Sequence, residues 1–265
     1  MSLFQATILG IVQGLTEFLP VSSSGHLVLA NYYFGWGHLP FYAEIATNTG
    51  TLLAVLVALR KDVMLAASGF AGLTSASARK GEGWWLALLV LIGSVPTAII
   101  GLALKDTIEA SLLRPFPVCL ALMFTGIFLW FAPKSGAKTD VRELRKRDAV
   151  IGGVAQGLAV IPGISRAGAT IVTMLWRGAN ADLAARFSFL MYLVVSVGVM
   201  LIGIVDIRES GIEPLPLIAM IASSFVTGYV ALVWLFALLR RGQFKWFAPY
   251  LWVVAGTTLV RLFST

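Results

Sequence analysis

The chain has 265 residues, of which 58% are hydrophobic and only 12% are charged, and its mean hydropathy is +0.87. Soluble domains carry about 25% charged residues, so this composition excludes an ordinary soluble protein and indicates an all-α integral membrane protein. The net charge of +7 does not indicate nucleic acid as a partner, because basic loops beside anionic lipid are the usual source of such a charge in membrane proteins. The start of the chain lacks the basic region and cleavage site of a signal peptide, and the single Cys119 excludes an internal disulfide.

The first stretch, 3–37, is apolar at both ends and polar in the middle. A helix over 3–19 would be roughly 25 Å long, but a second leg over 27–36 would extend only about 15 Å. That leg is too short to cross a hydrocarbon core of about 30 Å. We therefore predict a re-entrant hairpin that enters and leaves on one side, with its polar tip TEFLPVSSSGH (16–26) shielded by protein or by a water-filled cavity.

Three membrane-spanning helices are predicted after this hairpin, because each apolar run approaches the length of about 20 residues that crosses a bilayer. They are 41–60, 84–104 and 116–132. Pro96 lies inside the second span, and it predicts a kink of a kind that membrane helices tolerate. The intervening stretch 62–80 is short and rich in small residues, so we expect it to lie along the membrane interface.

The one clearly hydrophilic linker, PKSGAKTDVRELRKRD (133–148), divides the chain near its middle. A second stretch with an apolar–polar–apolar pattern, 149–180, follows it and predicts another re-entrant hairpin. Three further spans are predicted at 185–205, 215–239 and 245–263.

The two predicted hairpins share a sequence pattern. Shifted by 143 residues without a gap, Gly10, Gln13, Gly14, Leu15, Ser22, Gly25 and Gly35 meet identical residues at Gly153, Gln156, Gly157, Leu158, Ser165, Gly168 and Gly178. Each copy is followed by three spans, an odd number, so the second copy enters the membrane upside down. We predict an inverted-topology repeat, 1–132 and 149–265, with a site near the midplane where the two halves meet.

The basic residues predict the orientation in the membrane. Of the 20 Lys and Arg residues, fifteen fall on the side opposite the N-terminus, and four fall on the N-terminal side, namely Lys105, Arg114, Arg208 and Arg261. Cytoplasmic loops carry the basic excess. The linker is therefore expected in the cytoplasm, with both termini and the mouth of the first hairpin outside.

The twentieth basic residue, Arg166, lies in PGISRAGAT at the tip of the second hairpin. A cation within the membrane costs ~2.5–3.5 kcal/mol on insertion scales and marks a functional site by default. Arg suits phosphate oxygens, and the helix N-terminus after each tip favours an anion. We expect hydroxyls and glycine N–H groups from both tips to join Arg166 in one site, from Ser22, Ser23, Ser24, Gly25, Ser165, Gly168 and Thr170.

Glu17 and His26 flank the first tip and suggest phosphoryl chemistry. His26 is a candidate acid, base or nucleophile, and Glu17 either binds a divalent cation or orients His26. Other interpretations stay open: Ser24 as a capping residue, Glu17–Arg166 as a structural ion pair, and Glu44 with Asn48 as polar packing rather than as partners of the site.

These residues lie in two motifs, QGLTEFLPVSSSGH and PGISRAGAT, that resemble the signatures of bacterial undecaprenyl pyrophosphate phosphatases of the BacA/UppP type. GTLLAVLV and the six-span, two-hairpin layout extend the resemblance over nearly the whole chain. It implies an enzyme of the bacterial plasma membrane that removes the terminal phosphate from a polyprenyl diphosphate, recycles the lipid carrier of cell-wall synthesis and confers bacitracin resistance. It also implies a divalent cation, Mg²⁺ or Ca²⁺.

By motif match, the resemblance implies functional positions at Glu17, Ser22, Ser23, His26, Ser165, Arg166 and Thr170. We predict Glu17, Ser23, His26 and Arg166 as catalytic, Gln13 and the remaining tip residues as substrate-binding, and Glu17 as the metal ligand, with Gln13 and Glu44 as further candidates. Three positions depart from the family pattern: Gln13 replaces a frequent Glu, Ala167 replaces a Ser, and Asn48 replaces Gln or His.

Two questions stay open in the sequence. The nucleophile is Ser23, His26 or an activated water. The alternative function is a polyprenyl-phosphate transporter or flippase, because inverted repeats with midplane tips are a transporter design; an acid–base pair such as His26 and Glu17 favours chemistry. Small residues on the spans would permit a homodimer.

Overall fold

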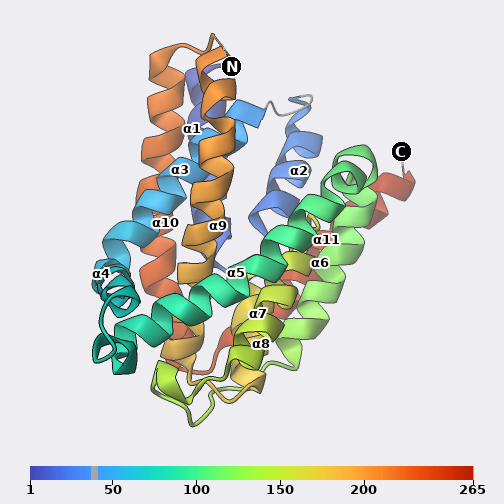
Figure 1. The fold of residues 1–265 in the computed structure, drawn as a ribbon. Coiled ribbons are helices and arrows are strands. Elements are labelled where there is room, and N and C mark those ends of the chain that lie inside the picture. Colours follow the sequence, from blue (N-terminus) through green and yellow to red (C-terminus); the bar gives the residue numbers. More distant parts are fainter. Residues whose placement is uncertain (37–40, 210, 265) are drawn as a thin grey trace.

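The computed structural model describes residues 1–36, 41–209 and 211–264, and nearly all of this chain is helical (Figure 1). The main helices are α1 (Leu3–Phe18), α2 (Ser23–Phe34), α3 (Phe41–Ala58), α4 (Arg60–Gly69), α5 (Glu82–Thr107), α6 (Pro115–Trp130), α7 (Lys146–Leu158), α8 (Arg166–Trp176), α9 (Ala181–Glu209), α10 (Pro214–Arg240) and α11 (Phe247–Ser264). The all-α fold of an integral membrane protein is therefore confirmed.

Both predicted hairpins are pairs of helices joined by a short connection, residues 19–22 in the first and 159–165 in the second. α1 ends where Leu19 turns extended (ψ 145°) before Pro20, as a residue preceding proline does. α2 has 12 residues and ends at Gly35, whose φ of 64° suits a glycine C-cap. α7 and α8 form the second pair, and α8 has only 11 residues. The predicted end of the first hairpin at 37 lies outside the described residues.

Four of the six predicted spans are long and apolar enough to cross a membrane, namely Glu82–Thr107, Ala181–Leu201, Pro214–Arg240 and Phe244–Ser264. The two other predicted spans correspond to α3 and α6, which are shorter apolar helices. α5 continues through Pro96 without interruption. The stretch 62–80 forms α4 and two short 3₁₀ turns, Phe70–Leu73 and Ala78–Lys80, and its place at the interface stays a prediction.

The repeated glycines lie where helices approach closely. α1 packs on α10, and a Cβ atom at Gly10 or Gly14 would come within 2.0 Å of a side-chain oxygen of α10. In the second half α7 packs on α5, where a Cβ atom at Gly153 would lie 2.0 Å from the carbonyl oxygen of Gly93. Small residues four apart allow such contacts between membrane helices. The matching glycines thus have matching structural roles, and each half's hairpin packs against a long helix of the other half.

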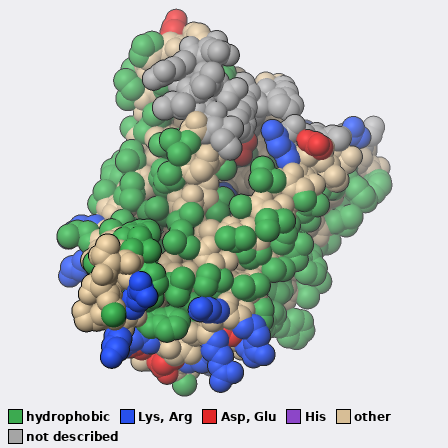
Figure 2. Space-filling model, viewed as in Figure 1, with side chains coloured by type: hydrophobic (Ala, Val, Ile, Leu, Met, Phe, Trp, Pro, Cys, Tyr) green, Lys and Arg blue, Asp and Glu red, His purple; other side chains and the backbone are tan. Residues whose placement is uncertain are grey.

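The two ends of the bundle differ in charge. Figure 1 shows both chain termini at one end and the linker, 133–148, at the other. Figure 2 shows Lys and Arg side chains gathered toward the linker end of the visible face, below a largely hydrophobic surface. This arrangement matches the charge asymmetry of the sequence, while the orientation in a bilayer and the division into two inverted repeats stay predictions.

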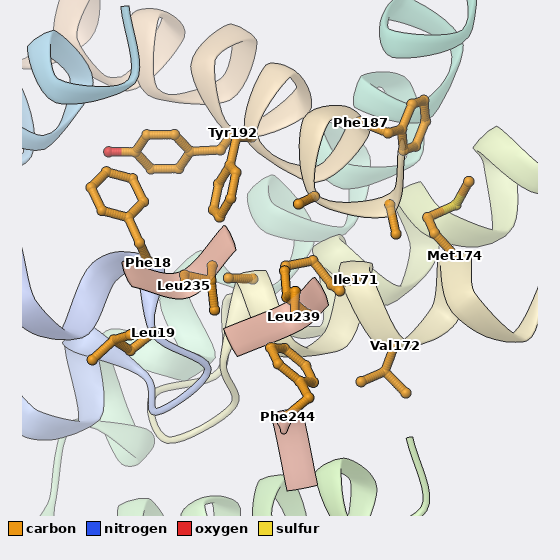
Figure 3. Close-up of a cluster of buried hydrophobic side chains, with 14 of the residues drawn as sticks. Phe18, Leu19, Ile171, Val172, Met174, Phe187, Tyr192, Leu235, Leu239 and Phe244 are labelled. Carbon is orange, nitrogen blue, oxygen red and sulfur yellow. The ribbon is translucent and has the colours of Figure 1, made fainter. Parts of the chain in front are cut away.

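The hydrophobic core closes around the first tip (Figure 3). Phe18, the last residue of α1, packs edge-to-face on Phe189 and Tyr192, with ring centroids 5.5 and 6.0 Å away. Leu235 of α10 and Ile171 of α8 belong to the same buried cluster. Apolar side chains from both halves of the chain therefore pack directly beside the first tip.

Candidate functional site

The tips of the two hairpins meet directly. Ser22 caps α2, and its Oγ accepts the backbone N–H of Gly163, 141 residues away, at 3.0 Å. Gly25 lies at the same contact, where a Cβ atom would come 3.0 Å from the Cα of Gly163. The predicted approach of the two tips is thus present in the structure.

Ser22 has an unusual backbone conformation, with φ 69° and ψ 97°, and it is the one non-glycine residue with positive φ among those described. Such conformations cost of order 1–3 kcal/mol and persist where the surroundings enforce them. The Ser22 hydroxyl also accepts the Gly25 N–H at 3.4 Å and lies 3.4 Å from the Ser24 hydroxyl. Its contacts therefore hold the tip, and the predicted contact with substrate would compete with them.

Glu17 is the buried centre of the site. The exposed fraction of its side chain is 2%, and its Oε1 accepts a bond of 2.6 Å from Arg166 Nη2. Its Oε2 accepts the amide of Gln13 at 2.9 Å and the hydroxyl of Ser23. Three donors thus hold one carboxylate, and it draws Ser23 and Arg166 from separate tips to within reach of each other.

Arg166 begins α8 and is positioned by both halves. Its guanidinium carbon lies 5.3 Å from the centroid of the Tyr192 ring, a cation–π contact. The Tyr192 hydroxyl in turn donates to Asn48 Oδ1 at 2.7 Å, so Asn48 supports the site through Tyr192. Glu44 is exposed and interacts electrostatically with Arg166. The guanidinium group of Arg has five N–H donors, and the Arg166 side chain is 30% exposed, so part of this group can face a ligand.

A pocket opens where the tips meet. It is lined by Glu17, Ser22, Ser23, Ser24, Ala159, Ile164, Ser165 and Arg166. Six of the residues predicted to form the site therefore share one cavity, although the two tips are far apart in the sequence. The N-terminus of α8 lies here as well, because Ser165 is its N-cap and accepts the Gly168 N–H at 3.0 Å.

Other predicted site residues serve the framework. The N–H groups of Gly25 and Gly168 donate to the capping serines Ser22 and Ser165, rather than standing free for a ligand. Thr170 is fully buried within α8, and its hydroxyl donates to the Arg166 carbonyl at 2.9 Å and lies 3.4 Å from Gln156 Oε1. It therefore contributes to the site through its neighbours.

His26 lies apart from the lining of this pocket. Its Nδ1 is 2.9 Å from the Ser22 carbonyl oxygen and its Nε2 is 2.8 Å from the Tyr250 hydroxyl, with the two rings stacked. Within the described chain, the structure records no bond from His26 to Glu17 or Arg166. The expected convergence thus holds for Glu17 and Arg166, while His26 reaches the site through Ser22. Sequence reasoning did not find Tyr250 or Tyr192, because neither lies near a motif.

The site offers few metal ligands of its own, so it suits only a cation whose other ligands are waters and substrate phosphates. Among the described residues, no group of three or more His, Cys, Asp and Glu side chains could hold a metal ion. Glu17 is the one carboxylate lining the pocket. Mg²⁺ is commonly held by one or two carboxylates together with substrate phosphates and waters, so the donor set fits such an ion when a phosphate is present.

Comparison with known proteins decides the family. Residues 6–257 match the family model described as bacitracin resistance protein BacA. The chain belongs to the BacA family. An undecaprenyl-diphosphatase of Acaryochloris marina is 66% identical over 264 residues, which cover 99% of both chains. Undecaprenyl-diphosphatases of Desulfosudis oleivorans and Carboxydothermus hydrogenoformans are 44% and 39% identical, and each match covers at least 96% of both chains.

The BacA-family match spans both hairpins and nearly all of the helices between and after them. It confirms the resemblance seen in the two tip motifs. The pocket formed by Glu17, Ser23 and Arg166 therefore lies in a BacA-family chain that matches these relatives over nearly their whole length.

Proposed function

We propose that this chain is a membrane phosphatase that hydrolyses undecaprenyl diphosphate to the monophosphate and inorganic phosphate, recycling the lipid carrier of cell-wall synthesis and conferring bacitracin resistance. Relatives named undecaprenyl-diphosphatase match it from end to end. The observation that carries the proposal is the meeting of Glu17, Ser23 and Arg166 at the joined tips. An anion-binding guanidinium, a hydroxyl and a carboxylate acceptor are the groups that phosphoryl transfer needs.

Arg166 binds the diphosphate in this mechanism. One of its N–H groups is bonded to Glu17, and the exposed 30% of the side chain can present further donors to phosphate oxygens, with which Arg forms strong charge-assisted bonds. The N-terminus of α8 beside it adds a favourable field for an anion. Charge that develops on the terminal phosphoryl group during transfer is stabilised by donors that are already in place.

Ser23 is the proposed nucleophile, because its hydroxyl donates to Glu17 Oε2 and a nucleophile is activated by an adjacent base. Its oxygen attacks the terminal phosphorus, its proton passes to Glu17, and the bond to the bridging oxygen breaks to release the lipid monophosphate. Water then cleaves the phosphoserine, and Glu17 accepts and returns the protons. A divalent cation held by Glu17, with substrate phosphate oxygens and waters as its other ligands, would neutralise charge on the diphosphate.

The decisive experiment is phosphate release from undecaprenyl diphosphate by the purified protein in detergent, with Ser23→Ala and Arg166→Ala as inactive references. Stoichiometric release of inorganic phosphate that both variants abolish supports the phosphatase. Binding of the lipid without release of phosphate would instead favour the transporter.

We also propose that both termini and the mouth of the pocket face the outside of the bacterial plasma membrane, on the basis of the charge asymmetry. In a Cys119→Ala background, a thiol at the exposed Ser111 should react with an impermeant reagent in intact cells, and a thiol at the exposed Ala137 of the linker should not. The reverse labelling would invert the orientation.

A further inference from the structure

A second small cavity lies behind Arg166, on the side of Tyr192. It is lined by Glu17, Phe18, Gln156, Arg166, Ala167, Ser188, Phe189 and Tyr192. Arg166 and Glu17 line both this cavity and the pocket at the tips. The Glu17–Arg166 ion pair therefore separates two spaces, and only the first contains the serines used by the mechanism above.

Gln156 brings an unused hydrogen-bond donor to this second cavity. It is 2% exposed, and its Nε2 is one of three buried side-chain N and O atoms of the described chain that have no hydrogen-bond partner. Its Oε1 lies 3.4 Å from the Thr170 hydroxyl, which directs the opposite end of the amide away from Thr170. Leaving a buried donor unsatisfied costs roughly 1–3 kcal/mol, so a native structure requires a reason for it.

The first half of the chain indicates what the missing partner is. Gln13, which matches Gln156 in the internal repeat, donates its Nε2 to Glu17, four residues further on the same helix. The residue four positions after Gln156 is Val160, which lies beyond the end of α7 and whose side chain offers no acceptor. In the first half, the Gln13 amide donates to a carboxylate. In the second half, the corresponding Gln156 amide has no anionic partner.

Three groups around the cavity favour an anionic oxygen there. The guanidinium of Arg166 carries the positive charge. α8 begins at Arg166, so the backbone N–H groups of Arg166 and Ala167 have no acceptor within the helix, whereas that of Gly168 donates to Ser165. Ser188 is buried with them and adds a hydroxyl. Glu17 is the one carboxylate in the lining, and its charge is already paired with Arg166.

We propose that the Gln156 amide and Arg166 form an anion subsite that binds a phosphate oxygen, either of the diphosphate headgroup or of the inorganic phosphate product. Gln156 is then a positioning residue: with Arg166 it holds one phosphate oxygen on the Tyr192 side of the ion pair, while the phosphorus stays on the Ser22–Ser24 side, within reach of Ser23. The inference rests on the phosphatase activity proposed above, and it names the group that orients the substrate phosphate.

The test is Gln156→Met, which keeps the volume and removes the donor, with Gln243→Met in the turn after α10 as the matched control. A hydrogen bond to a charged group is worth about 1.5–3 kcal/mol, so kcat/KM for undecaprenyl diphosphate should fall roughly 10–100-fold. Thermal stability should stay equal or rise, because the variant removes an unsatisfied donor. A merely structural amide predicts the opposite pairing, lower stability with unchanged turnover per folded molecule.

Inhibition by inorganic phosphate identifies the source of the oxygen. If the inhibition constant rises in Gln156→Met along with the loss of kcat/KM, the subsite binds the transferred phosphate. If kcat/KM falls and the inhibition constant does not change, it binds the phosphate that stays on the lipid. Gln156→Met with kcat/KM equal to that of Gln243→Met would overturn the proposal.

Gln156→Asn provides a second variant in case the methionine variant does not fold. It keeps the amide but withdraws it by one methylene, so kcat/KM should again fall at least tenfold; wild-type kcat/KM would overturn the proposal. An inactive wild-type protein would instead count against the phosphatase itself, so the two failures are distinguishable.

Discussion

The two hairpins have similar backbones and opposite chemistry. Each consists of a first helix, a tight tip and a short second helix capped by a serine, Ser22 or Ser165. The tip of the first hairpin carries a carboxylate and hydroxyls, whereas the tip of the second carries Arg166. Neither hairpin alone holds both an anion-binding cation and an acceptor for the Ser23 proton, so the site exists only when the tips meet.

The comparison also explains why a glutamine common to both halves has two environments. The Gln13 amide orients the Glu17 carboxylate through a hydrogen bond, and Glu17 in turn holds Arg166 across the contact between the two hairpins. Gln156 has the matching position on α7, but α7 ends at Leu158, and the residue that corresponds to Glu17 is Val160, just beyond the helix. The two hairpins thus share a framework but differ in charge, and this difference leaves one ion pair, Glu17–Arg166, and one donor without a partner, Gln156 Nε2.

The largest effect is expected from exchanging the cation of the second tip. Arg166→Lys keeps the charge but loses the planar fork, and removing one donor that is already aimed at developing charge costs about 10²–10³ in kcat. The measurement is phosphate release by the solubilised variant, with its thermal stability recorded in parallel. Near-normal turnover in a stable Arg166→Lys protein would show that a point charge suffices and return the pair to a structural role.

Removing the same cation altogether tests the ion pair. Arg166→Ala leaves the Glu17 carboxylate with its side chain 2% exposed and without its counter-charge; breaking such buried pairs destabilises by about 3–5 kcal/mol. Adding Glu17→Gln should restore much of this stability without restoring activity. Additive losses in the double variant would mean that the two groups are not energetically coupled.

Much of this comparison could be predicted from the sequence, because it is carried by local patterns. The short second legs, the serines at the tips and the lone membrane arginine indicated both hairpins and the Glu17–Arg166 meeting. The contacts of His26 could not be predicted, since its partner Tyr250 is 224 residues away on α11 and lies in no motif. The role of Tyr192 could not be predicted for the same reason, because a tyrosine in an apolar helix is interpreted as a buried core residue until its neighbours are known.

The His26 contact allows a closely matched test. Tyr250→Phe removes the hydroxyl bonded to His26 Nε2, and it should lower kcat by about a few-fold, because the ring that also contacts the Ser22 carbonyl at the tip is then held by one hydrogen bond fewer. Tyr33→Phe is the control, since its hydroxyl bonds Thr258 between the same two helices, α2 and α11. Equal turnover in the two variants would show that the His26–Tyr250 contact serves only the packing of α2 against α11.

The two capping serines offer a direct comparison of the tips. Ser165→Ala removes a helix cap, which typically costs about 1 kcal/mol. Ser22→Ala removes a cap and also leaves the Gly163 N–H without its acceptor, so the free energy of unfolding should fall by about 2 kcal/mol or more. Chemical or thermal denaturation in the same detergent measures both. A Ser22→Ala variant as stable as Ser165→Ala would show that the bond between the tips contributes little.

The smallest effect on turnover is expected at the linker end of the second hairpin, where Asp148 lies. Asp148 is fully buried and accepts from Arg177 Nε at 2.7 Å and from the Arg145 N–H at 3.0 Å, with Lys138 3.5 Å away. Burial raises the pKa of this carboxyl, but the bonds from Arg145 and Arg177 outweigh it and hold the pKa below its usual value.

A lowered pKa in the folded protein means that the unfolded chain takes up the proton first as the pH falls. The stabilisation by Asp148 is therefore present above about pH 4, the value for an unfolded Asp, and is lost as the pH falls below it. Asp148→Asn should lower the thermal midpoint at pH 7 and flatten its dependence on pH below about 4, while phosphate release at neutral pH stays near normal. A variant whose midpoint falls with acid as steeply as the wild type would place that acid sensitivity in other carboxylates.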